Sequence, residues 1–521
     1  MLAFIGRRIS IALLILFGSS FIAYNLEAYA GDPLAGLAES TAPNKDYLIA
    51  TLTRELQLDV PPPARYFLWL KGVLGFLTGH FDLGMTRDAS PVLAQMATAI
   101  PVTLRLVTGA TFTAIILGIT IGIISAIRQY SRLDYVMTFI SFLLFSLPVF
   151  WVAVLLKQYL AIGFNDFMGH TDANGNPQTA IPVEWILAIA AILGVVFAGF
   201  VSGTRKRVLI TWAATFVGFS GMLFAISATN WLLNPQLSIV GVGLMSIGVA
   251  VGLTYVLTGF ENRGALKAGL TTAGIAILSY YPFQLLAGPG TNAFVILALG
   301  LVSLAIAFTV GWFFVKVDRG PVIRVSMFTA VFAGFFMLVD RIMQSWSAYF
   351  NSDAINRRPI PTIGDSNPLL NSNDFWIQTL DGLTHVALPT MALTLISFAG
   401  YVRYARGSLL EVLNMDYIRT ARAKGLGERQ VILRHAMRNA MIPLTTLIAF
   451  DIAGILGGAI ITESVFGWKG MGTLFRNAIG SQDLNLFMGG LVLTSFLAVM
   501  ANLAADLLYS ALDPRIRIGK K

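Results

Sequence analysis

The sequence predicts an all-α protein that crosses a membrane about twelve times. Its 521 residues are 56% hydrophobic and only 12% charged, a balance outside the range of ordinary soluble domains. The apolar residues lie in runs of about 20, the length at which a helix spans a hydrocarbon core of about 30 Å. Basic residues gather in alternate loops, which the positive-inside rule assigns to the cytoplasm together with both termini.

The first predicted span occupies residues 1–30 and is followed by an external segment at 31–100. Arg7 and Arg8 precede the apolar run, and residues 28–30 (AYA) resemble a small-residue cleavage site, so a cleaved signal peptide is the alternative. A retained span is favoured because the run approaches the length that a bilayer requires. The external segment is predicted because the sequence there turns polar and contains several prolines.

Residues 101–162 are predicted to hold the second and third spans. Pro148 should kink the third span, because proline removes one backbone hydrogen bond. Kinked helices often line a polar path, which makes Ser146 and Pro148 candidates for such a path. A proline that is tolerated against a neighbouring helix is the alternative interpretation.

Residues 163–344 are predicted to hold six more spans. The six apolar runs lie near 182–202, 208–229, 237–259, 268–287, 293–315 and 325–343. The first, third and fifth loops between them are basic, and the second and fourth carry no charge, as alternating topology requires. Two interpretations of this block stand: a peripheral jacket of helices that packs beside the remainder or binds lipid or a partner, or a role in handling substrate.

Residues 345–384 read as an external loop, residues 385–511 as three further spans and residues 512–521 as a cytoplasmic tail. Asp451 lies inside a span, where an unpaired carboxylate costs about 2.5–3.5 kcal/mol. It should therefore line a path and favour cationic or amine-bearing substrates, or else pair with a basic or polar neighbour. Nearby glycines allow close helix approach or a thin wall along a cavity: Gly454, Gly457 and Gly458.

The loop at 404–438 interrupts these last spans with a basic, helix-forming sequence. Between positions 403 and 438 the chain has eight basic and three acidic residues. Asp416 is expected to cap a short helix, and Gly425 to end it in the left-handed conformation. Tyr417, Ile418 and Ala421 fall on one side, and small side chains would let another protein approach closely: Thr420, Ala421, Ala423 and Gly425. A solvated basic loop is the alternative; a nucleic-acid site is disfavoured because few aromatic residues interleave with the arginines.

Several motifs resemble the ABC importer permeases of the dipeptide, oligopeptide and nickel family. They are DYIRTARAKGL at 416–426, RHAMRNAMIP at 434–443, IPVTL at 100–104, SLPVFW at 146–151, HVALPT at 385–390 and TESVFGWKGMG at 462–472. The resemblance implies a six-helix permease core into which the block at 163–344 is inserted. It also implies that a coupling helix docks on a separate ATPase subunit through Asp416, Tyr417, Ile418, Arg419, Thr420, Ala421, Arg422, Ala423, Lys424 and Gly425.

The resemblance further implies the partners: a second homologous permease, two ATPase subunits that carry ATP and Mg, an extracytoplasmic substrate-binding protein and membrane lipid. The expected location is the cytoplasmic membrane of a bacterium or archaeon, and the expected substrates are peptides, with nickel or another solute left open. The chain itself should bind no cofactor or metal and hydrolyse no ATP, because the sequence has no GxxxxGK[ST] phosphate loop. The alternatives are an ion-coupled secondary transporter, disfavoured by the lack of internal repeats, or a scaffold that docks a non-ATPase protein.

Overall fold

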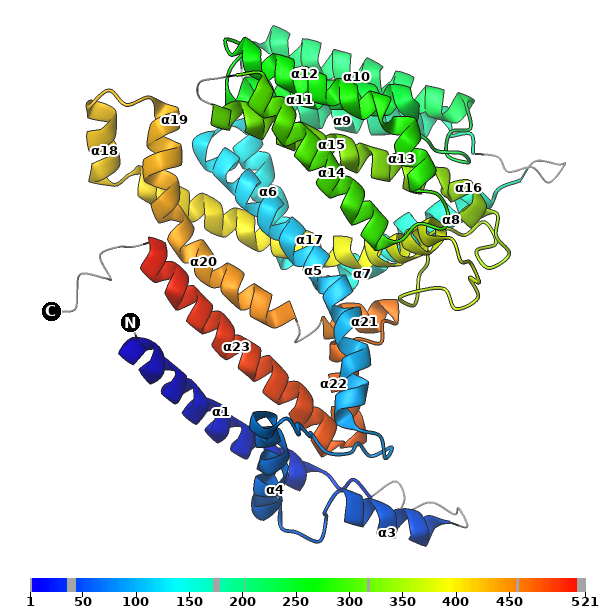
Figure 1. Cartoon of the computed structure of the whole chain (residues 1–521), viewed down its shortest axis with the longest axis vertical. Coiled ribbons are helices and arrows are strands. Elements are labelled where there is room, and N and C mark those ends of the chain that lie inside the picture. Colours follow the sequence, from blue (N-terminus) through cyan, green and yellow to red (C-terminus); the bar gives the residue numbers. More distant parts are fainter. Residues whose placement is uncertain are drawn as a thin grey trace. The chain divides into compact units, whose positions relative to one another are not determined.

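The computed structural model describes residues 2–34, 44–171, 179–201, 203–315, 319–455 and 459–512. These residues form helices and connecting loops (Figure 1). Met85 and Pro91 form one isolated β-bridge, and the described residues contain no β-strand. The chain divides into two compact units, which are considered separately. The first unit is Met1–Tyr159, Thr362–Asp365 and Val386–Lys521, and the second is Leu160–Pro361 and Ser366–His385.

The first unit is built from long apolar helices with short helices between them. Its long helices are α1 (Leu2–Ala30), α5 (Val92–Ile127), α6 (Arg132–Ser146), the later part of α17 (Phe375–Leu413), α20 (Met437–Gly454) and α23 (Leu484–Leu512). Its short ones are α3 (Lys45–Glu55), α4 (Pro62–Leu74), α7 (Val149–Leu156), α18 (Asp416–Ala423), α19 (Glu428–Gln430), α21 (Ile460–Phe466) and α22 (Met471–Ser481). Helix α23 packs against both α1 and α20.

The bounds of the second unit enclose the whole predicted insert at 163–344. Its helices are α8 (Gly163–Gly169), α9 (Val183–Phe200), α10 (Arg205–Ala228), α11 (Ser238–Leu257), α12 (Arg263–Leu278), α13 (Tyr280–Leu286), α14 (Ala293–Phe313), α15 (Arg319–Gln344) and α16 (Trp346–Phe350). Helix α15 is central to this unit, since it packs against α11, α12 and α14. The unit begins at Leu160 and continues past position 344, where the insert was predicted to end.

Asp340 of α15 holds one end of the second unit together. Its side chain is fully buried, and Oδ1 accepts hydrogen bonds from the backbone nitrogens of Leu237 and Ser238. The other oxygen, Oδ2, accepts from the Tyr280 hydroxyl at 2.6 Å and from the side-chain amides of Gln284 and Gln344. A buried carboxylate is tolerated when hydrogen-bond donors surround it, so this residue is structural.

Within the described ranges, nine helices are long and apolar enough to cross a membrane. A tenth span results if α6 and the α7–α8 segment are taken as one bent pair. The two remaining predicted runs are helical but do not meet the same criterion: the run at 268–287 is divided between α12 and α13, and α20 includes the polar residues Arg438, Asn439 and Asp451. The all-helical fold is confirmed, and the count of twelve stays a prediction.

The third predicted span is broken, which is a stronger effect than the expected kink. Helix α6 ends at Ser146, Leu147 is extended, and Pro148 is the N-cap of α7. The two helical segments differ in direction by 103°. The break follows from the chemistry of proline, since Pro148 has no N–H and disfavours helical geometry in the residue before it.

Candidate functional site

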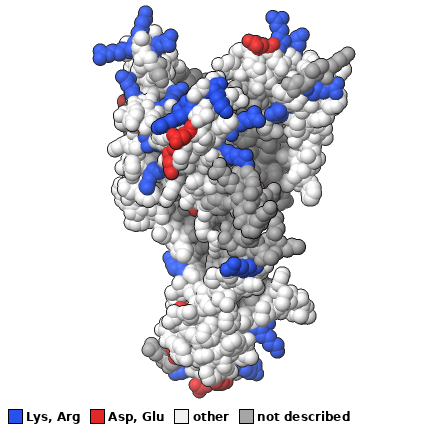
Figure 2. Space-filling view, turned by 90° about the vertical axis from the view of Figure 1, so that its left-hand side faces the viewer, with Lys and Arg blue, Asp and Glu red and all other residues white. Residues whose placement is uncertain are grey.

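The basic loop at 404–438 folds as a short helix held against the ends of longer ones. Helix α17 continues to Leu413, α18 follows at Asp416, and a turn leads through α19 and a π-helical segment, Val431–Ala436, into α20 (Figure 1). Lys and Arg side chains outnumber Asp and Glu on the face drawn in Figure 2, which includes this end of the first unit. The arrangement agrees with the predicted order of helix, glycine break and helix.

The start of α18 differs from the prediction. Met415 is the N-cap, with extended backbone and no capping side chain, and Asp416 is the first helical residue. The Asp416 side chain is 97% exposed and lies 3.6 Å from Arg419. Because a carboxylate in the first turn still interacts favourably with the helix dipole, Asp416 suits this position without serving as the cap.

The end of α18 is as predicted. Gly425 has a φ of +77°, in the left-handed region. Its backbone nitrogen donates to Arg422 O at 2.9 Å, and the Leu426 nitrogen donates to Ala421 O at 3.4 Å. These two bonds form a Schellman motif, and partly buried Leu426 supplies its hydrophobic contact.

Replacing Gly425 by alanine should loosen α18 without any steric collision. No heavy atom lies within 4 Å of a Cβ added there, so the cost is the backbone strain of about 1–2 kcal/mol that an L-residue meets in the left-handed region. Hydrogen exchange of the α18 amides should accelerate about 5- to 30-fold. Gly427→Ala is the matched control, because Gly427 has equal space around it and a φ of −59°. Equal exchange rates in the two variants would contradict the role assigned to the left-handed turn.

The inner side of α18 is buried against neighbouring helices. Ile418 is fully buried and Ala421 is 8% exposed. They belong to a cluster, called here the loop core, with Ala126 of α5, Leu409 and Val412 of α17, Val431, Ala436 and Ala440. The Tyr417 side chain is also held in position, because its hydroxyl accepts a hydrogen bond from Asn439 Nδ2 at 2.6 Å. Ile418 and Ala421 therefore position the helix, and the prediction that these two side chains belong to an open docking surface is wrong.

The outer side of α18 is exposed. Its open residues are Asp416, Arg419, Thr420, Arg422, Ala423, Lys424 and Gly425. Arg422 forms an ion pair with Glu428 of α19 at 2.6 Å, and the hydrogen bonds from Arg422 lower the pKa of Glu428. Both side chains are largely exposed, so the pair contributes little to stability and serves mainly to link the two short helices.

An ion pair between a buried carboxylate and a partly exposed arginine, missed from the sequence, anchors α17 at the beginning of this loop. Arg406 donates from Nε and Nη2 to the two carboxylate oxygens of Asp134, at 2.7 and 3.0 Å. The Ser125 hydroxyl and the Tyr130 nitrogen also donate to Asp134, whose side chain is 3% exposed. The sequence feature that could have drawn attention to Asp134 is the capping sequence at the start of α6. There Ser131 Oγ accepts a hydrogen bond from the Asp134 nitrogen.

The predicted path residues are only partly brought together. Asp451 and Gly454 are exposed and lie one turn apart on α20. Ser146 and Pro148 lie at the break between α6 and α7, and the Ser146 hydroxyl donates to Leu143 O within its own helix. Gly457 and Gly458 lie outside the described residues.

Asp451 has a partner that sequence reasoning missed. The hydroxyl of Tyr401, on α17, donates to Asp451 Oδ2 at 2.6 Å. Tyr401 lies 50 positions earlier in the chain. A contact between residues so far apart in the chain has no local sequence pattern. It exists because α17 and α20 lie side by side in the fold.

A second buried carboxylate organises the TESVFGWKGMG segment. Glu463 is fully buried; Oε1 accepts from the Thr103 hydroxyl at 2.9 Å and Oε2 from the Thr473 nitrogen at 2.7 Å. Thr103 in turn accepts from the Met471 nitrogen. Gly470 packs directly against the Glu463 carboxylate, where a Cβ would collide with it. The contacts join this segment to α5 and explain why glycine is needed at position 470.

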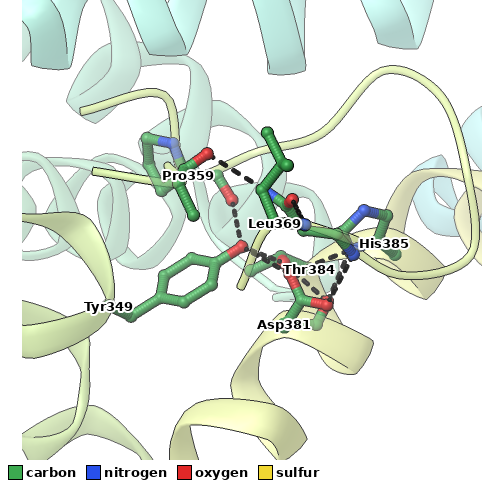
Figure 3. A network of polar contacts seen from close by, with 8 residues as sticks. Tyr349, Pro359, Leu369, Asp381, Thr384 and His385 are labelled. Carbon is green, nitrogen blue, oxygen red and sulfur yellow. Dashed lines mark hydrogen bonds and ion pairs between the residues drawn. The ribbon is translucent and has the colours of Figure 1, made fainter. Parts of the chain in front are cut away.

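The second unit has its own buried polar network, centred on Asp381 (Figure 3). The Tyr349 hydroxyl donates to Asp381 Oδ1 at 3.2 Å, and the Asn367 nitrogen donates to Oδ2 at 3.0 Å. Thr384 and His385 bond back to the Asp381 carbonyl from the next turn of α17. The network fastens the stretch predicted as an external loop to the start of α17, which is why most of that stretch belongs to the second unit.

Comparisons with known proteins extend these observations. Residues 272–518 match the family described as binding-protein-dependent transport system inner membrane component. The chain is 41% identical over 156 residues to the oligopeptide transport system permease protein OppB of Mycobacterium tuberculosis, covering 30% of this chain and 48% of that protein. It is 42% identical over 165 residues to the dipeptide transport system permease protein DppB of Escherichia coli K12, covering 30% of this chain and 49% of that protein.

The chain spans about half the length of the curated relatives that it matches. The family match and the long apolar helices show a multi-pass protein of the cytoplasmic membrane, part of which is similar to peptide permeases. The relatives are described as permeases, in agreement with the expectation that the chain is not itself an enzyme.

Proposed function

We propose, from the permease-family domain at residues 272–518, that this chain is the transmembrane permease subunit of an ABC importer of peptides. The observation that carries the proposal is the geometry of α18. It is a short, charged helix outside the apolar spans, with an open outer side and an inner side locked into the loop core. A helix of this kind suits docking against a separate protein.

The loop core explains how force on α18 would reach the membrane. Ile418 and Ala421 pack in one cluster with residues of α5, α17 and α20, so displacement of α18 must displace the ends of those helices. Packed cores transmit strain because they are nearly incompressible. Nucleotide-driven closure of an ATPase dimer would in this way open and close a path beside α20.

In the assembly that we propose, this chain pairs with a second homologous permease, and each permease docks through its α18 on one of two ATPase subunits. ATP and Mg are bound by the ATPase subunits. An extracytoplasmic binding protein delivers the peptide to a path that includes Ser146, Pro148, Asp451, Gly454, Gly457 and Gly458. Six spans form the core, the six inserted spans pack as a peripheral jacket, and both termini are cytoplasmic.

Reconstitution tests this proposal. The chain, purified from its own membrane with whatever remains bound, should retain an ATPase subunit and, in lipid vesicles, should transport a labelled tripeptide only when ATP is supplied on the α18 side. Hydrolysis should accelerate when binding protein and peptide are added together. Uptake driven by an ion gradient without ATP would contradict the proposal and favour a secondary transporter, and purification with a non-ATPase protein in place of an ATPase would favour a scaffold.

A further inference from the structure

We infer that Asp451 and Tyr401 form a site inside the membrane that recognises a cationic group of the substrate, an ammonium or a guanidinium. The inference rests on the proposed function, because it assigns a chemistry to the path through which a permease would pass its substrate. It goes beyond that function by naming a charge preference and the two side chains that produce it.

If α20 crosses the membrane as the sequence predicts, Asp451 lies near the middle of the hydrocarbon core. The Ser408 hydroxyl of α17 donates a hydrogen bond to Ala440 O of α20 at 2.8 Å. The two residues therefore lie at the same height along the helices, close to the basic loop. Asp451 follows Ala440 on the same helix by about 16 Å, at 1.5 Å per residue. The hydrocarbon core is about 30 Å thick, so this distance reaches its middle. Substrate sites of transporters commonly lie at this depth.

Tyr401 holds one oxygen of the carboxylate in place. It is 3% exposed, and its Cβ lies against Gly118 of α5, where an added Cβ would collide with it. It also packs with Ala114, Ala405 and Leu444. Because the ring is confined on these sides, its hydroxyl has a fixed position from which to donate to Asp451 Oδ2 at 2.6 Å.

The other side of the Asp451 carboxylate is open. The side chain is exposed, and within the described residues Tyr401 is the only hydrogen-bond donor recorded for it. A carboxylate can accept about four hydrogen bonds. Exposing that remaining capacity to hydrocarbon is unfavourable, so the open side should face a water-filled path. An ammonium or guanidinium in that path would form a charge-assisted hydrogen bond with Oδ1.

The experiment compares two tripeptides that differ in charge at one side chain. Cells that express the chain with its native partners are given a tripeptide with central lysine or with central norleucine, and initial uptake rates are measured. Asp451→Asn should lower the rate for the lysine peptide about tenfold, the effect of losing one charge-assisted hydrogen bond, and leave the norleucine peptide nearly unchanged. Tyr401→Phe should shift the ratio in the same direction by less.

Two further variants make the outcome decisive. Asp451→Glu should keep the preference for lysine, since it keeps the charge. Asp353→Asn makes the same chemical change at an exposed position of the second unit and should leave the ratio at the wild-type value. A lysine-to-norleucine ratio in Asp451→Asn equal to the wild-type ratio, whether both rates are unchanged or both fall by the same factor, would overturn the inference. ATP-independent uptake by the wild type would instead contradict the proposed function, while the ratio of the two rates would remain measurable.

Discussion

Ala423→Glu should abolish ATP-driven uptake while leaving the chain folded in the membrane. Ala423 is an exposed residue on the outer side of α18, so the substitution disturbs no packing within the chain. In a docked complex the new carboxylate would be buried without a partner, which costs several kcal/mol and corresponds to well over a hundredfold loss of affinity. The expected result is uptake below a hundredth of the wild-type rate in reconstituted vesicles.

The comparison with a buried neighbour separates docking from folding. Ala423→Ser adds one small polar atom on the open side and should transport at close to the wild-type rate. Ala421→Glu places a charge in the loop core and should reduce the amount of folded chain itself. Wild-type uptake by Ala423→Glu would show that the outer side of α18 docks nothing, and the proposed coupling would have to be abandoned.

Arg406→Ala should destabilise the first unit by about 1.5–3 kcal/mol, the usual contribution of hydrogen bonds to a charged group, because Asp134 is buried although Arg406 is partly exposed. Asp134 would keep the donors Ser125 and Tyr130 but lose both guanidinium bonds, and its buried charge would be left without a counter-ion. The loss should appear as a lower midpoint of thermal unfolding for the detergent-purified chain, followed by size-exclusion chromatography after heating.

Two substitutions calibrate this effect. Arg406→Lys retains the charge but not the two-pronged geometry, so its midpoint should lie between those of the wild type and Arg406→Ala. Arg419→Ala removes an arginine whose side chain is 70% exposed, and it should leave the midpoint within error of the wild type. A midpoint for Arg406→Ala equal to that of Arg419→Ala would mean that the pair with Asp134 does not stabilise the fold.

The sequence was informative wherever the cause of a structure is local. Gly425 was predicted to end α18 because only glycine occupies the left-handed region without strain, and Pro148 to disturb its helix because it has no N–H. The long apolar helices follow from the length and composition of single runs. One local prediction was wrong: Asp416 was expected to cap α18. Its side chain suits a cap chemically, but the residue lies one position inside the helix.

The hydrogen-bond partners of the carboxylates could not be read from the sequence. Asp451 was recognised as a carboxylate that needs an explanation, yet its donor Tyr401 lies on another helix, as do the partners of Asp134 and Glu463. Likewise, the helical period predicted that Ile418 and Ala421 share a side, but it does not say whether that side faces solvent or protein.

The sequence by itself determined that this protein is a helical membrane protein with a short, glycine-terminated helix in a basic loop, and it indicated the family. Hydropathy, helix period and turn chemistry act over a few residues, so they are written in contiguous stretches of chain. The tertiary structure alone decided which side of α18 is open and which side chain donates to each of the carboxylates Asp134, Asp451 and Glu463. Those features depend on residues tens to hundreds of positions apart, which only the packing of the helices brings within hydrogen-bond distance.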